Sequence, residues 1–113
     1  MSLDVRTMGD VTILTPKGML LGGKETDELQ GKIKELGEAG NSKLLINLGH
    51  TTFMNSVSLG VLIAGHSNYA KRNAKMKLCA VDKKIQNIFV VTKLSLVFDA
   101  GYDSEGEALA SFK

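Results

Sequence analysis

An almost uninterrupted apolar run at residues 44–48 constrains the fold more than any other feature of this sequence. Four of its five residues are Leu or Ile, and only Asn47 is polar. Such a run predicts a strand that is buried on both faces, as in the parallel sheets of α/β domains. Strand-like and helix-like patterns alternate on either side of it. The sequence therefore predicts an α/β fold with a mixed, mostly parallel sheet.

The N-terminal sequence predicts a β-hairpin. Apolar and polar residues alternate over residues 3–7, which is the period of a half-buried strand. Gly9-Asp10 then supplies a two-residue turn, and residues 11–15 are expected to return as the second strand. Residues 18–23 are expected to form a loop that leads into the first helix.

Two amphipathic helices flank the central apolar run. The first begins at Lys24, and its apolar face carries Leu29, Ile33 and Leu36. The second, capped by Asn55, has a wide apolar arc that includes Val57, which predicts a largely buried helix. The remaining expected elements are a strand at residues 76–81 with Lys77 facing outward, a helix capped by Asp82, a strand at residues 96–98 and a C-terminal helix opened by Ser104.

Length and composition predict a single domain over residues 1–113, with about four helices. The 14 Lys and Arg against 12 Asp and Glu leave a net charge of +2, which is too balanced for a direct nucleic-acid partner. One Cys and two His cannot build a Cys/His zinc site, and no cofactor motif appears. No apolar run reaches the length of a membrane span, and the N-terminus lacks a secretory pattern. A cytoplasmic protein without metal, cofactor or membrane contact is therefore expected.

The residues that suggest an enzyme lack the context that catalysis requires. Ser56 is not in the Gly-x-Ser-x-Gly elbow that exposes a nucleophile in α/β hydrolases. His66 lies within an apolar helical stripe and is interpreted as a packed or interface residue, and His50 as a solvated loop residue. Gly22-Gly23-Lys24 lacks the spacing of a Walker phosphate loop. No paired acid and base is visible, so the chain is not expected to be an enzyme.

Ser56 has two interpretations from its position alone. It falls in the first turn of the predicted second helix, where unfilled N–H groups and the positive end of the helix dipole accommodate a phosphate. Alternatively, Asn55 and Ser56 simply cap that helix. The residues themselves leave both interpretations open.

Residues 53–61, Phe-Met-Asn-Ser-Val-Ser-Leu-Gly-Val, are similar to the STAS-domain signature of bacterial anti-sigma factor antagonists. That signature runs aromatic-Met-Asp-Ser-Ser/Thr-Gly-Leu-Gly. Further landmarks of the family follow in the right order over almost the whole chain: the N-terminal hairpin, Gly18-Met19-Leu20, the run at residues 44–48, residues 93–98 and Glu107-Ala108-Leu109. The resemblance implies a single STAS-type α/β domain.

The resemblance also implies a mechanism, partner switching, and the partners for it. An unphosphorylated antagonist binds an anti-sigma factor with a histidine-kinase-like ATPase domain, which is also a serine kinase, and thereby frees a sigma factor. Phosphorylation ends this binding, and a PPM-type serine phosphatase restores it. The family's phosphorylated serine falls on Ser56, with Ser58 as a second, less favoured hydroxyl. The residues implied in partner binding are Leu21, Gly22, Thr52, Asn55, Ser56, Val57, Ser58 and Leu59.

Several positions depart from the family pattern. The usual Asp is Asn55, the second hydroxyl residue is Val57, and the following Gly is Ser58. No carboxylate follows the Gly-x-Leu turn, where Leu21 and Gly22 stand instead. Two alternatives therefore remain open: a STAS scaffold or regulatory subunit without a phosphorylation switch, and a small nucleotide- or anion-binding STAS domain.

Overall fold

The structure is a computed structural model that describes residues 3–81, 102 and 104–112. The strands are β1 (Leu3–Met8), β2 (Val11–Pro16), β3 (Gly18–Leu20), β4 (Lys43–Asn47), β5 (Thr51–Met54) and β6 (Lys75–Cys79). The described helices are α1 (Lys24–Glu38), α2 (Ser56–Lys71) and α4 (Glu105–Ser111). The expected α/β fold is confirmed, while the helix expected after Asp82 and the strand expected at residues 96–98 lie outside the described residues.

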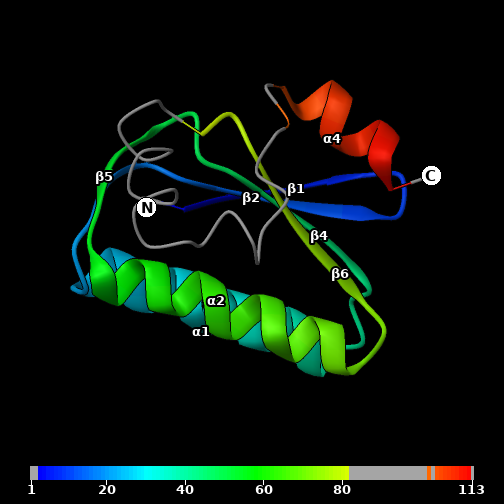
Figure 1. The fold of residues 1–113 in the computed structure, drawn as a ribbon, viewed down its shortest axis with the longest axis horizontal. Coiled ribbons are helices and arrows are strands. Elements are labelled where there is room, and N and C mark those ends of the chain that lie inside the picture. The colour runs from blue at the N-terminus through cyan, green and yellow to red at the C-terminus, as the bar shows by residue number, and fades with distance from the viewer. Residues whose placement is uncertain (1–2, 82–101, 103, 113) are drawn as a thin grey trace.

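Four strands form the main sheet in the order β1-β2-β4-β6. The β1–β2 hairpin is antiparallel and turns at Gly9-Asp10, where Gly9 has a φ of +62°. The pairs β2–β4 and β4–β6 are parallel. Figure 1 shows α1 and α2 side by side along one face of this sheet, with α4 on the other face. The predicted mixed, mostly parallel sheet is therefore confirmed.

The central run at residues 44–48 is buried on both faces of the sheet, as predicted. Leu44 and Ile46 belong to the core cluster that packs under α1 and α2. Leu45 belongs to the second cluster, which includes Ala108 and Phe112 from the α4 side. All three strand residues are fully buried, because successive side chains of a strand alternate between two covered faces.

A second, two-stranded sheet replaces part of the loop expected at residues 18–23. Strand β3 pairs in parallel with β5, with Met19 opposite Phe53 and Leu20 opposite Met54. Neither strand was expected, because three and four residues are too few to show a clear alternation, and each is stabilised by a partner distant in sequence. The Thr51 hydroxyl, which donates to the Pro16 carbonyl over 3.1 Å, fixes β5 beside the end of β2.

Two expectations about exposure are wrong. The buried face of α2 is narrower than predicted, because sheet and α1 cover only one side of it, and Val57 is 55% exposed. Gly65 lies on the buried face, where an added Cβ would be 3.0 Å from the Ile33 side chain. Lys77 does not face outward: its Nζ donates to the Ser111 carbonyl over 3.1 Å and lies over the Phe112 ring. It therefore joins β6 to the end of α4.

Candidate functional site

The first turn of α2 is fixed by a complete capping box. The Asn55 Oδ1 accepts hydrogen bonds from the backbone N–H groups of Val57 (3.1 Å) and Ser58 (3.2 Å). In return, the Ser58 hydroxyl oxygen accepts from the Asn55 backbone N–H over 3.0 Å. Two N–H groups that a helix start otherwise leaves unpaired are satisfied by one side chain. The predicted role of Asn55 as cap is confirmed.

The two serines of this turn are in opposite environments. Ser58 is fully buried, and its hydroxyl lies 3.0 Å from the Asn55 carbonyl, to which it donates. Ser56 is exposed, and no residue in the described ranges 3–81, 102 and 104–112 forms a hydrogen bond with its hydroxyl. Of these two hydroxyls, only that of Ser56 is exposed.

Asn55 also connects α2 to a segment 34 residues earlier in the chain. Its Nδ2 donates to the Leu21 carbonyl over 2.9 Å. Next to Leu21, Gly22 has a φ of +89°, and an added Cβ would lie 3.1 Å from the Val57 side chain. The Gly22 N–H donates to the Thr26 hydroxyl over 2.9 Å. The turn before α1 and the first turn of α2 are thus held together, and Gly22 leaves room for Val57.

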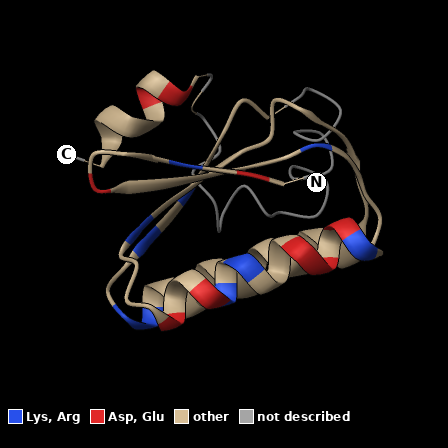
Figure 2. Cartoon of the chain, turned by 180° about the vertical axis from the view of Figure 1, so that it is seen from behind, with Lys and Arg blue, Asp and Glu red and all other residues tan. Residues whose placement is uncertain are grey.

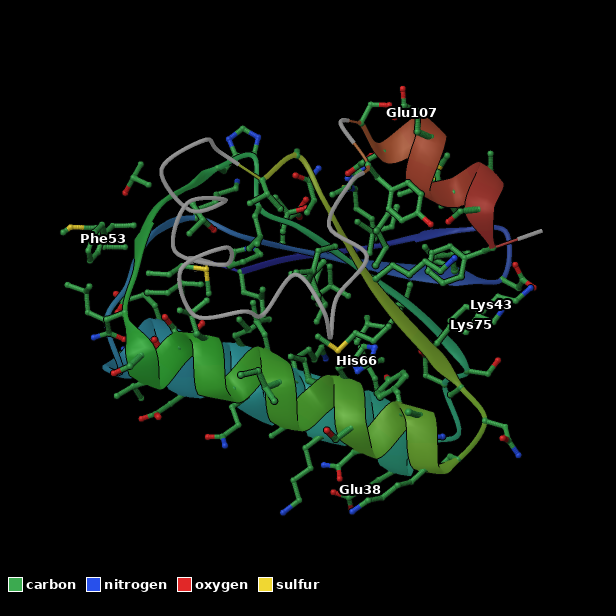
Figure 3. The ribbon with its side chains drawn as sticks, in the orientation of Figure 1. Glu38, Lys43, Phe53, His66, Lys75 and Glu107 are labelled. Atoms are coloured by element: carbon green, nitrogen blue, oxygen red, sulfur yellow. The ribbon has the colours of Figure 1, made fainter. Side chains whose placement is uncertain are left out.

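Exposed apolar side chains gather around this junction, and we call the four of them the apolar rim: Met19 (50% exposed), Leu21 (46%), Phe53 (46%) and Val57 (55%). Met19 and Phe53 are neighbours across the β3–β5 pair. Figure 3 shows Phe53 pointing away from the body of the molecule at the end where α2 begins. Large exposed apolar residues that cluster at one end of a domain are typical of a protein interaction surface.

The charge at the start of α2 differs from that of the other described helices. No acidic residue lies in its first turn, whereas α1 has Glu25 and Asp27 there and α4 has Glu105 and Glu107. Figure 2 shows acidic residues at the beginnings of both α1 and α4. The positive end of the α2 dipole therefore has no carboxylate of its own turn beside it.

The structure brings most of the predicted partner-binding residues to one surface. Leu21, Ser56 and Val57 are exposed there, and Asn55 and Gly22 are partly buried, while Thr52 is exposed on β5. Ser58 and Leu59 are the exceptions, because both side chains face the core.

Met19 and Phe53 belong to this surface but were not among the predicted contact residues. The sequence does indicate a strand around Phe53, because two Thr residues and this aromatic residue lie close together between Gly49 and Asn55. Only the pairing of that run with β3 places the two side chains together.

The residues considered for other chemistry do not assemble into a site. His50 is exposed in the turn before β5, and Figure 3 shows His66 on the sheet side of α2. Cys79 is fully buried, and its burial and the nearby Glu105 carboxylate raise its pKa to about 11, although Arg6 opposes the shift. Within the described part of the chain, no group of three His, Cys, Asp or Glu side chains is placed to hold a metal ion. None of the described helices is long and apolar enough to cross a membrane.

Comparisons with known proteins agree with this fold. TM1081 of Thermotoga maritima, provisionally described as an anti-sigma factor antagonist, is similar with a TM-score of 0.88 and 21% identity over 96% of this chain and 92% of that one. The anti-sigma factor antagonist SpoIIAA of Bacillus, in its phosphorylated form, gives a TM-score of 0.77 and 15% identity over 98% and 99%. A sulfate transporter family protein of Wolinella succinogenes gives 0.73 and 12% over 94% and 87%. The STAS domain family model matches residues 2–108, so the chain belongs to the STAS domain family.

Proposed function

We propose that this chain is an anti-sigma factor antagonist that works by partner switching. In its unphosphorylated form it binds an anti-sigma factor through the apolar rim and the first turn of α2, and this binding frees a sigma factor. The histidine-kinase-like ATPase domain of the anti-sigma factor phosphorylates Ser56 and ends the binding, and a PPM-type phosphatase reverses the modification. The chain is then a substrate and a competitor rather than an enzyme, and it acts in the cytoplasm.

The observation that carries this proposal is the position of the Ser56 hydroxyl. It is exposed and follows directly on the cap residue Asn55, whose amide is bonded to Leu21 of the apolar rim. Its neighbour Val57 is itself part of the rim. A modification of Ser56 therefore changes the charge of the surface without touching the core. The similarity to SpoIIAA, which is known in phosphorylated and unphosphorylated forms, supports the proposal.

A phosphate on Ser56 would act mainly on the interface. Phosphoserine carries about −1.5 to −2 charges at neutral pH. A partner shaped to cover the apolar rim and a neutral hydroxyl would have to desolvate that charge without an ion pair. Such a burial costs several kcal/mol, so the affinity is expected to fall at least about a hundredfold.

The same phosphate would change the fold itself very little. The N–H groups of Val57 and Ser58 already donate to Asn55, so they are not open to a phosphate unless the cap is displaced. The favourable contribution then comes from the helix dipole, and it is limited to about 2 kcal/mol. Binding and stability should therefore respond differently to the modification.

The experiment uses the anti-sigma factor kinase encoded in the same genome, with calorimetry for affinity and intact-mass analysis for phosphorylation. Unmodified protein and Ser56→Ala should bind, but only the unmodified protein should take up one phosphate when ATP and Mg²⁺ are added. Ser56→Asp should bind poorly. Ser58→Thr, which keeps the buried hydroxyl, should still be phosphorylated. Phosphate found on Ser58 would show that the assigned residue is wrong.

A STAS scaffold or regulatory subunit without a switch is the second candidate, and Asn55 is the observation that favours it. The Asn55 amide donates to the Leu21 carbonyl, which the carboxylate usual in the family cannot do. If a kinase shown to be active on another substrate modifies no serine while binding persists, this second candidate is correct. Stabilisation by a nucleotide in a thermal-shift screen, independent of any protein partner, would instead indicate a nucleotide- or anion-binding domain; about 2.7 kcal/mol is expected at a hundred times Kd.

A further inference from the structure

A groove runs between α1 and α2 at the end of these helices farthest from Ser56. Its larger part has a volume of about 400 Å³ and lies between the C-terminal halves of the two helices. Figure 1 shows both helices on the same face of the sheet. Glu38, which lines it, extends away from the sheet below the helix pair in Figure 3.

The larger part of the groove is lined by an arginine that two neighbouring residues hold in position. The Arg72 guanidinium lies 4.6 Å from the centre of the Tyr69 ring and donates to the Asn41 carbonyl over 3.1 Å. An added Cβ at Gly37 would lie 3.3 Å from Arg72 and 3.5 Å from the Tyr69 ring, so a larger residue there would crowd the guanidinium. The hydrogen bond to Asn41 uses one of the five guanidinium N–H donors, and the planar group is suited to binding a carboxylate.

Positive charge predominates along the walls of this part of the groove. Lys34 from α1 and Lys71 and Arg72 from the end of α2 line it, against the single carboxylate of Glu38. Neither Lys34 nor Lys71 forms an ion pair with any side chain that the structure describes. Helix α2 contains no acidic residue over its whole length. The groove therefore has unpaired cations on both of its walls.

The groove continues toward the middle of the helices as a smaller hollow of about 130 Å³. Small or apolar residues of α2 line it: Val61, Ala64 and Gly65. From Val61 to Arg72 the groove follows α2 for about 17 Å at 1.5 Å per residue, which is the length of about three helical turns. Gly65 is packed against Ile33 of α1, so the surface open to a partner is formed by the exposed Ala64 and the half-buried Val61.

We propose that this groove binds an acidic amphipathic helix of a partner protein. The apolar face of that helix would lie on the floor formed by the α1–α2 pair, and its carboxylates would pair with Lys34, Lys71 and Arg72. Helix-in-groove recognition of this kind depends on apolar anchors spaced along the partner helix, with the charges fixing register and specificity. Ser56 and Arg72 lie at opposite ends of α2, about 24 Å apart for its length. The two surfaces can therefore be occupied at the same time.

The test is a titration of ¹⁵N-labelled protein followed by heteronuclear NMR. The probe is a stapled helical peptide of about 12 residues with Glu on its polar face and Leu on its apolar face. We expect saturable chemical-shift changes at the amides around Lys34, Gly37 and Arg72. We expect no comparable changes at the amides around Ser56. The matching peptide with Gln in place of Glu should bind at least about tenfold more weakly.

Single charge reversals provide the matched variants. Lys34→Glu and Lys71→Glu should each lower the affinity for the acidic peptide about tenfold. Lys24→Glu changes the net charge equally but lies at the other end of α1, and it should change the affinity less than about twofold. Removing the one opposing carboxylate in Glu38→Gln should strengthen binding. These lysines are on the surface, so melting curves should confirm that each variant is folded.

Several results would overturn the proposal. One is equal binding of the Glu and Gln peptides, and another is an equal loss in Lys24→Glu and Lys71→Glu. Failure of the acidic peptide to produce saturable shifts would also exclude it. If a single-stranded oligonucleotide or phosphatidylglycerol vesicles perturb the same amides more strongly than the peptide, the occupant is not an acidic helix. Since none of these measurements involves Ser56 or an anti-sigma factor, they are independent of the partner-switching proposal.

Discussion

The first turns of α2 and α4 have similar N-caps, but the residue that follows the cap has different contacts in the two helices. Each is preceded by an extended residue whose side chain accepts a hydrogen bond from the N–H three positions on, Asn55 for α2 and Ser104 for α4. In α4 the next residue is Glu105, which bonds to Arg6 from β1 and, over 2.6 Å, to the Asn47 Nδ2 from β4. In α2 the residue at that position is the exposed Ser56.

The contacts of Glu105 show that the start of α4 stabilises the fold. Burial alone would raise its pKa, but the hydrogen bonds from Asn47 and Arg6 and the positive charge of Arg6 outweigh burial and lower the pKa. The carboxylate therefore stabilises the helix dipole and joins three elements at once. The start of α2 has its own hydrogen-bond network through Asn55, but it has no carboxylate in its first turn. The carboxylate at the start of α4 thus holds three elements together, whereas the start of α2 has an exposed hydroxyl at the same position.

The largest effect that would test this comparison is on partner binding. Val57→Lys places a charge within the apolar rim, and we expect the affinity for the anti-sigma factor to fall about a hundredfold, which corresponds to about 2.7 kcal/mol. Met8→Lys on β1 is the matched control, because Met8 is similarly exposed, at 52% against 55% for Val57. Equal losses in both variants would show that the rim is not the binding surface.

The next largest effect is on stability at the two caps. Asn55→Ala removes two cap hydrogen bonds and the bond to Leu21, so its unfolding free energy should fall by about 1–2 kcal/mol. Ser104→Ala removes one cap bond, over 3.2 Å, and should cost less, about 0.5–1 kcal/mol. Asn55→Asp should keep the cap but lose the bond to Leu21. Chemical denaturation of the three variants would contradict this order if Ser104→Ala proved the most destabilised.

The third effect depends on pH. The folded-state pKa of Glu105 is lowered, so its stabilisation is present above the pKa of the unfolded chain and is lost as the pH falls through the folded pKa. Glu105→Gln should therefore destabilise the protein by about 1 kcal/mol at neutral pH and hardly at all in acid. Glu25→Gln, in the exposed first turn of α1, should cost less at neutral pH. Urea titrations over a pH series would count against the assigned role of Glu105 if the gap between wild type and variant stayed constant.

The smallest effect is a gain in stability at α2. Ser56→Asp puts a negative charge at the unbalanced helix start, and we expect it to stabilise the fold by about 0.3–1 kcal/mol at low salt. The same substitution should weaken partner binding strongly, so the two measurements should move in opposite directions. A thermal melt that shows Ser56→Asp to be clearly less stable than Ser56→Ala would mean that the start of α2 does not accept negative charge.

Local patterns in the sequence were sufficient for the parts of the fold that depend on neighbouring residues. Spacing and residue type were enough to predict three features that the structure has. These are the burial of residues 44–48 on both faces of the sheet, the start of α1 at Lys24 and the N-cap at Asn55. The C-terminal helix that was predicted from the capping residue Ser104 is also present. These features share a cause, since each is decided within a few residues.

Features that depend on distant partners could not be predicted in the same way. The pairing of β3 with β5 brings together residues about 34 positions apart, and it alone places Met19 beside Phe53. Lys77 was expected at the surface, but it lies beneath the end of α4, which only the tertiary fold puts there. Val57 matched an apolar helical stripe, yet α1 and the sheet cover the other side of α2. The candidate site was therefore located by its motif, whereas its shape required the structure.

The buried thiol of Cys79 makes local opening of the structure measurable. It lies at the end of β6, where its carbonyl accepts the Leu48 N–H and the strand bridges to Tyr102. With a pKa of about 11 the group is protonated at neutral pH, and it meets no reagent until this edge of the sheet separates. The rate at which a thiol-specific dye labels the native protein therefore reports on this local opening. A ligand that holds β6 in place is expected to slow the labelling of Cys79. A ligand that binds only at the start of α2 is expected to leave the labelling rate unchanged.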